Sequence, residues 1–115
     1  MKREEFLRLI KGKVVSGADC EEQDVEHVFA SDLMSDVLTI KNAEHLMLIT
    51  GLCNMQTIRT CEMAEVKVVL FVRGKKVTEE MKELAEENEM LLIETDYSMY
   101  RCSGILYQAG LPPLY

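Results

Sequence analysis

The sequence predicts an α/β layered domain with a mostly parallel central sheet. Three short apolar runs, each followed by an amphipathic segment, indicate three strand–helix units in series. The connections between units are only a few residues long, which requires parallel strands joined by right-handed crossovers. The apolar runs are nearly continuous, as expected for strands covered on both faces. With 115 residues, the chain is expected to form a single domain over residues 1–115.

The N-terminal part of the chain predicts one short helix and two short strands. Apolar residues at helical spacing predict a helix over residues 3–10, which Gly12 ends. Strands are predicted over residues 13–16 and 25–30, with a polar, acidic loop over residues 17–24 between them. These two strands either add to an edge of the sheet or form a separate small layer.

A Ser-Asp pair occurs twice, four residues apart, in the segment 31–38. On a helix this spacing stacks Ser31 over Ser35 and Asp32 over Asp36. Two interpretations stay open. The segment is either a capped, half-exposed helical turn, or it presents two carboxylates and two hydroxyls to a pocket.

The three strand–helix units have well-marked boundaries. Apolar and β-branched residues predict strands over residues 45–50, 66–72 and 90–94. The helices that follow are expected to begin after good N-cap residues, which are Asn54, Thr78 and Ser98.

Composition and charge exclude several classes of protein. The chain contains thirteen Lys and Arg residues and twenty Asp and Glu residues, so its net charge is -7. Long-range repulsion then disfavours nucleic acid and anionic membranes as partners. No apolar run approaches the roughly 18–20 residues of a transmembrane helix, and no signal peptide is evident. We therefore expect a cytoplasmic protein that contacts neither membrane nor nucleic acid.

The four cysteines form no Cys-x-x-Cys pair, and the two histidines lie 18 residues apart. No metal site or cofactor is expected, because structural zinc ligands come in close pairs. The thiols are expected to be reduced and to pack as small hydrophobic groups. Cys53 directly precedes a predicted helix start, where the helix dipole lowers a thiol pKa.

In an open parallel sheet, ligands collect beyond the carboxyl ends of the strands. The first strand end offers a glycine and then the free N–H groups of a helix start, an arrangement that suits an anion. The second offers the basic loop 73–76. The cations of this loop either contribute to binding an anion or are only solvated surface charge. The candidate ligand-binding residues at these ends are Thr50, Gly51, Asn54, Gln56, Arg59, Arg73, Lys75, Thr95 and Ser98.

The motifs of the common catalytic folds are missing from the sequence. It contains no P-loop, no Gly-x-Gly-x-x-Gly after a strand and no Gly-x-Ser-x-Gly elbow. Neither histidine belongs to a recognisable triad, and two carboxylates one helical turn apart are more often solvated charge. We do not expect the chain to be an enzyme.

Four segments together resemble the DRTGG domain family, and in particular its small stand-alone bacterial members. The segments are 30–38, 48–54 together with 58–60, 95–99 and 104–111. The resemblance implies an α/β domain similar to the N-terminal domain of HPr kinase/phosphorylase. In that family the domain is a non-catalytic regulatory or dimer-forming module. The resemblance places emphasis on Ser31, Asp32, Ser35, Asp36, Thr50, Gly51, Asn54, Thr95 and Ser98.

The leading expectation is a regulatory interaction module that forms a homodimer. It is expected to sense a small anionic metabolite or nucleotide at the strand ends, or to bind a partner protein. The alternative is a purely structural dimerisation or scaffold protein, and a small enzyme is the third interpretation.

Overall fold

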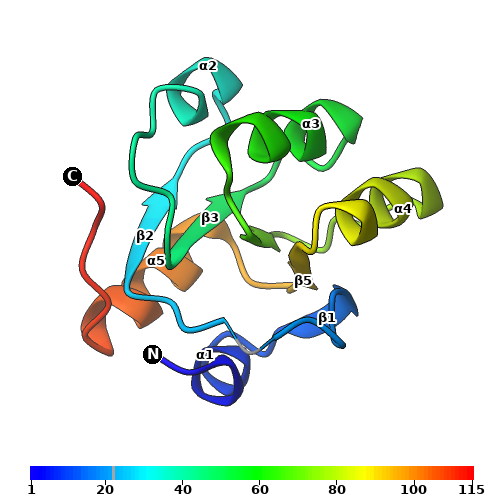
Figure 1. Cartoon of the computed structure of the whole chain (residues 1–115). Helices are drawn as coiled ribbons and strands as arrows, with labels where there is room; N and C mark the ends of the chain where they lie inside the picture. Colours follow the sequence, from blue (N-terminus) through cyan, green and yellow to red (C-terminus); the bar gives the residue numbers. More distant parts are fainter. Residues whose placement is uncertain (22) are drawn as a thin grey trace.

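A five-stranded sheet forms the centre of the computed structural model, which describes residues 1–21 and 23–115 (Figure 1). The strands are β1 (Lys13–Ser16), β2 (His27–Ala30), β3 (Leu46–Thr50), β4 (Val68–Phe71) and β5 (Leu91–Glu94). Their spatial order is β1-β5-β4-β3-β2. All neighbours are parallel except β1, which pairs antiparallel with β5. The predicted α/β fold with a mostly parallel sheet is confirmed.

The two N-terminal strands lie at opposite edges of this one sheet. β1 borders β5, and β2 borders β3. Of the two alternatives left open by the sequence, addition to the sheet edge is therefore correct. β2 begins two residues later than predicted. The acidic loop predicted over residues 17–24 includes Glu22, which lies outside the described residues.

Five helices cover the two faces of the sheet in the described part of the chain. They are α1 (Arg3–Leu9), α2 (Met34–Val37), α3 (Met55–Ala64), α4 (Glu79–Glu87) and α5 (Met99–Gln108). The helices α2, α3 and α4 pack on one face, and α1 and α5 pack on the other (Figure 1). Right-handed crossovers between strands that lie in chain order put every connecting helix on the same side.

The central strands explain the continuous apolar runs of the sequence. Every residue of β3, β4 and β5 is buried. Side chains alternate between the faces, so Leu48 and Val69 pack under α3 and α4, whereas Met47 and Ile49 pack under α1 and α5. Both faces therefore need apolar residues.

The predicted helix starts are confirmed by their caps. The side chains of Asn54, Thr78 and Ser98 accept hydrogen bonds from backbone N–H groups in the first turns of α3, α4 and α5. Each cap satisfies one of the donors that a helix start leaves without an intrahelical partner. None of the helices in residues 1–21 and 23–115 has the length and apolar character needed to span a bilayer.

The expected helical turn over residues 31–38 is wrong in its first part. The helix α2 begins only at Met34, after Leu33 in extended backbone, and Ser31 and Asp32 precede it outside the helix. The Ser31 hydroxyl accepts a hydrogen bond from the Leu33 N–H at 3.0 Å, which offers the backbone a non-helical partner. The predicted stacking of the two Ser-Asp pairs does not form.

Two glycines allow a matched test of backbone packing. Gly17 has a φ of +87°, and a Cβ atom there would lie 2.2 Å from the Met90 carbonyl oxygen. Gly104 lies within α5, and a Cβ atom there would meet nothing within 4 Å. We expect Gly17→Ala to lower the free energy of unfolding by more than about 1 kcal/mol, and Gly104→Ala to raise it by about 0.5–1 kcal/mol. Urea denaturation measures both, and equal effects of the two variants would contradict this packing.

Candidate functional site

The register of the sheet brings the carboxyl ends of the strands to one level. Thr50 at the end of β3 pairs with Phe71, and Phe71 pairs with Glu94 at the end of β5. The loops that follow β3, β4 and β5 therefore leave the sheet side by side. We call this border the strand-end edge, and it is the place where the sequence predicts a ligand.

Asp32 organises the loop that follows β3. Its Oδ1 atom accepts hydrogen bonds from the Thr50 hydroxyl at 2.9 Å and from the Gly51 N–H at 2.7 Å. The Thr50 hydroxyl in turn accepts a hydrogen bond from the Leu52 N–H at 3.1 Å. A Cβ atom at Gly51 would lie 3.6 Å from both carboxylate oxygens, so this loop and the carboxylate approach each other closely. Asp32 is exposed, and within the described residues its Oδ2 atom has no hydrogen-bond partner.

The loop 73–76 follows β4 and is tied to the loop that follows β5. The Arg73 N–H donates to the Tyr97 carbonyl at 2.7 Å, and the Gly74 N–H donates to the Thr95 carbonyl at 3.0 Å. Arg73 and Gly74 both have positive φ, at 62° and 73°. The loop therefore turns sharply while its backbone donors point at the neighbouring segment.

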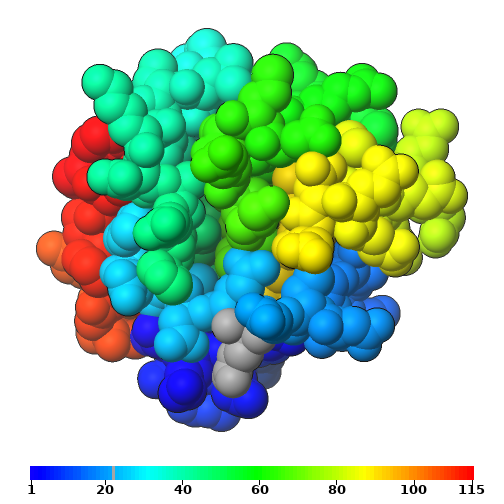
Figure 2. Space-filling model, viewed as in Figure 1, coloured from blue at the N-terminus to red at the C-terminus, as the bar shows by residue number. Residues whose placement is uncertain are grey.

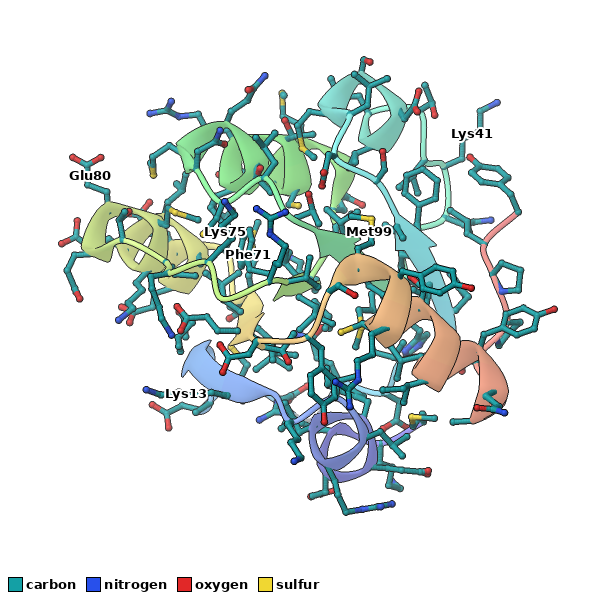
Figure 3. All side chains as sticks on the ribbon, turned by 180° about the vertical axis from the view of Figure 1, so that it is seen from behind. Lys13, Lys41, Phe71, Lys75, Glu80 and Met99 are labelled. Atoms are coloured by element: carbon teal, nitrogen blue, oxygen red, sulfur yellow. The ribbon has the colours of Figure 1, made fainter. Side chains whose placement is uncertain are left out.

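Two cations of this loop point into solvent. Arg73 and Lys75 are exposed, and across residues 1–21 and 23–115 neither side chain makes a hydrogen bond or ion pair. Figure 3 shows Lys75 beside the end of β4, where Phe71 lies. We call Arg73 and Lys75 the cationic pair.

Glu94 is a member of this edge that the sequence analysis missed. Its side chain is buried, its Oε2 atom accepts a hydrogen bond from the Val77 N–H at 2.8 Å, and its Oε1 atom lies 3.6 Å from the Lys76 Nζ. The Cys53 thiol donates to the Lys76 carbonyl at 3.3 Å. The sequence does carry a signal for this residue, which is an acidic side chain at the end of an apolar strand. Because a carboxylate is rarely buried unless it is paired, such a residue indicates a polar partner nearby.

The environment of Cys53 reverses the expected direction of its pKa. Burial raises the pKa of the Cys53 thiol, the nearby Glu94 carboxylate raises it further, and Lys75 lowers it to a smaller extent. The lowering expected from the helix start is therefore wrong. Burial also raises the pKa of Cys61 to about 12 and that of Cys102 to about 11. All four cysteines are free thiols.

Several predicted polar residues hold the local structure together. Asn54 and Ser98 cap helices through their side chains. The buried Thr95 hydroxyl donates to the Ile10 carbonyl at 2.6 Å and accepts from the Tyr97 N–H at 3.2 Å, which fastens the end of α1 to the end of β5. These groups are occupied, so among the predicted residues on the described loops of the strand-end edge, the cationic pair and Asp32 are left to meet a ligand.

Four predicted residues lie on helices and not on the loops of the strand-end edge. Ser35 and Asp36 are exposed on α2, and Gln56 and Arg59 are exposed on α3. Within the described residues, none of their side chains makes a hydrogen bond or ion pair. Hydrogen bonds connect Asp32 with Thr50 and Gly51, and Arg73 and Lys75 lie on the loop after the neighbouring strand β4, whereas these four residues lie on helices.

A depression of about 1140 Å³ lies at the border of the sheet opposite the strand-end edge (Figure 2). It borders the amino ends of β3 and β4, where Leu46 and Lys67 line it. Six of its described lining residues are acidic and one is lysine, so it does not suit an anion. No group of His, Cys, Asp or Glu side chains that could hold a metal ion occurs in the described part of the chain.

The two aspartates of the Ser-Asp repeat provide a matched test of the Asp32 network. Asp32→Ala leaves the buried Thr50 hydroxyl and the Gly51 N–H without their acceptor, and we expect a loss of about 1–3 kcal/mol in the free energy of unfolding. Asp36→Ala removes an exposed carboxylate and should change it by less than about 0.5 kcal/mol. Chemical denaturation of both variants decides the matter, and a smaller loss for Asp32→Ala than for Asp36→Ala would refute the network.

Alkylation tests the raised pKa of Cys53. Near neutral pH, a raised pKa leaves less of the reactive thiolate, so iodoacetamide should modify Cys53 more slowly in the folded chain than in the same chain unfolded in urea. Raising the pH above the ordinary thiol pKa should increase the folded-state rate. Mass spectrometry of the labelled peptide measures it. Faster modification of the folded chain at neutral pH would mean an activated thiol.

Comparison with known proteins shows a similarity to a solved structure. No family model and no curated protein matches the sequence. Among solved structures, the chain is similar to the CBS and DRTGG domains of the regulatory region of the Clostridium perfringens pyrophosphatase, complexed with its activator diadenosine tetraphosphate. The TM-score is 0.75 at 17% identity, and the match covers 96% of this chain and 47% of that chain. The chain thus spans about half the length of its structural neighbour, with which it shares the fold.

Proposed function

We propose that this chain is a non-catalytic regulatory module of the DRTGG type. It forms a homodimer and binds a small anionic metabolite, of which a nucleotide is the best candidate, at the strand-end edge. The cationic pair carries this proposal. Arg73 and Lys75 are exposed on the loop that follows β4, between the loops that follow β3 and β5. Within the described residues they are two unpaired cations, in a chain whose net charge is -7.

The charges at the strand-end edge favour a nucleotide over a simple anion. The cationic pair offers donors for phosphate oxygens, and Arg73 can bind two of them at once. The free Oδ2 atom of Asp32 accepts hydrogen bonds, which inorganic phosphate dianion supplies poorly and ribose hydroxyls supply well. A ligand that carries both phosphates and hydroxyl donors therefore matches the side chains present.

The structural neighbour supports a regulatory role. That protein's CBS and DRTGG region is a regulatory region and binds a dinucleotide activator. The shared fold and the resemblance of the four segments to the DRTGG family agree with each other. Both favour a regulatory module that responds to ligand binding over an enzyme that converts a substrate.

The positions of the histidines favour a non-catalytic role. His27 and His45 lie at the amino ends of β2 and β3, and the His45 ring contacts the Asp24 carbonyl at 3.1 Å. The strand-end edge is at the other end of these strands. The usual general base is thus remote from the proposed ligand.

Ligand binding is tested by calorimetry and thermal melts with diadenosine tetraphosphate, ATP, AMP and inorganic phosphate. We expect a nucleotide to stabilise the fold by about 2.7 kcal/mol at a hundred times its dissociation constant. The double variant Arg73→Ala/Lys75→Ala should weaken that binding at least tenfold, because each lost charge-assisted hydrogen bond contributes about 1.5–3 kcal/mol. The matched control is Arg8→Ala/Lys41→Ala, which also removes one exposed arginine and one exposed lysine.

In Figure 3, Lys41 lies well away from Lys75. The control should therefore bind nucleotide as the natural chain does. Equal weakening in both double variants would reduce the effect to net charge and remove the site from the strand-end edge.

A structural dimerisation or scaffold protein is the second candidate function. The observation in its favour is that Thr50, Asn54, Thr95 and Ser98 all use their polar groups inside the fold. Under this alternative, no compound of the panel shifts the melting temperature. A phosphate-containing compound that is turned over would instead favour the third interpretation, a small enzyme.

A further inference from the structure

An apolar hollow of about 310 Å³ lies where β2, α5 and residues 111–115 meet. Its floor includes Leu106 and Leu111, which are almost completely buried. At its border, the Phe29 and Tyr115 rings meet edge to face, with centroids 5.8 Å apart. We call this feature the β2–α5 hollow.

The hollow differs from the rest of the surface in charge and in aromatic content. None of its lining side chains is charged, although 29% of the residues of the chain are. Two lining tyrosines protrude into solvent, since Tyr107 is 69% exposed and Tyr115 is 79% exposed. Aromatic residues without charged neighbours are typical of the buried centre of protein interfaces.

The C-terminal segment prevents one kind of contact at this edge. The Val28 N–H donates to the Pro112 carbonyl at 3.1 Å, and the Leu114 N–H donates to the Val28 carbonyl at 3.0 Å. In Figure 2 this segment lies at the surface beside the β2 region. Pro113, which faces Val28, has no N–H to offer to a further strand. A partner at this edge is therefore held by side-chain packing and not by extension of the sheet.

We propose that a second copy of this chain occupies the hollow, in a two-fold symmetric dimer in which Tyr107 of each copy packs into the β2–α5 hollow of the other. This inference rests on the homodimer of the proposed function and names its interface. It is independent of the ligand at the strand-end edge.

Charge and shape together favour a second copy as the occupant. Two copies with a charge of -7 each repel one another, so a contact between them is opposed least where the lining side chains carry no charge. A cationic partner would instead be attracted to the acidic depression, which lies elsewhere. A protruding aromatic side chain beside an apolar hollow is also self-complementary, because a two-fold axis matches each knob with the other copy's hollow.

The matched pair Tyr107→Glu and Met63→Glu tests this interface. Both positions are similarly exposed, at 69% and 65%, but Met63 lies on α3, which packs on the other face of the sheet. Sedimentation velocity at low to high micromolar concentration should show dimers for the natural chain and for Met63→Glu, and monomers for Tyr107→Glu. The milder Tyr107→Ala should weaken the dimer at least tenfold while circular dichroism stays unchanged.

Each result has a definite consequence. A dimer that persists in Tyr107→Glu, or that Met63→Glu disrupts equally, overturns this interface and leaves the homodimer with another face. A natural chain that is monomeric at high micromolar concentration overturns both the interface and the homodimer, and leaves the hollow to a small apolar ligand or an unrelated protein. Neither result decides whether a nucleotide binds, which the Arg73→Ala/Lys75→Ala variant tests separately.

Discussion

The order of the four parallel strands is the constraint on which the rest of the structure depends. Because β2, β3, β4 and β5 follow one another in space as in sequence, right-handed crossovers place α2, α3 and α4 on one face. The other face is left to α1 and α5, which flank the set of crossovers. Two helices cover less of a sheet than three, and the β2–α5 hollow lies on the side of α5, next to the outermost parallel strand.

The same strand order produces the strand-end edge. Parallel strands in register end together, so the loops after β3, β4 and β5 become neighbours without any long insertion. The backbone then fixes them to one another. Arg73 and Gly74 donate to carbonyl groups of the next loop, and Asp32 clamps the β3 loop from the β2 side. The cationic pair is therefore presented by a framework of backbone hydrogen bonds.

Local signals made the strands and the helix caps predictable from the sequence, and tertiary contacts decided the rest. The caps Asn54, Thr78 and Ser98 act within their own first turns, so their residue type is sufficient. The role of Asp32 depends on Gly51, nineteen positions away, and no local pattern reveals that contact. The pKa of Cys53 depends on burial and on Glu94, which outweigh the helix start that the sequence shows.

The helix α5 is common to the two proposed surfaces. It begins next to the strand-end edge, where the Arg101 guanidinium stacks on the Tyr97 ring at 3.8 Å, and the Tyr97 carbonyl accepts the Arg73 N–H. Near its other end it carries Tyr107, the contact residue of the proposed dimer. Arg73, which would hold the ligand, is therefore connected to α5 through two contacts, one with Tyr97 and one between Tyr97 and Arg101. Where such a ligand changes dimer affinity, linkage requires dimerisation to change ligand affinity by the same factor.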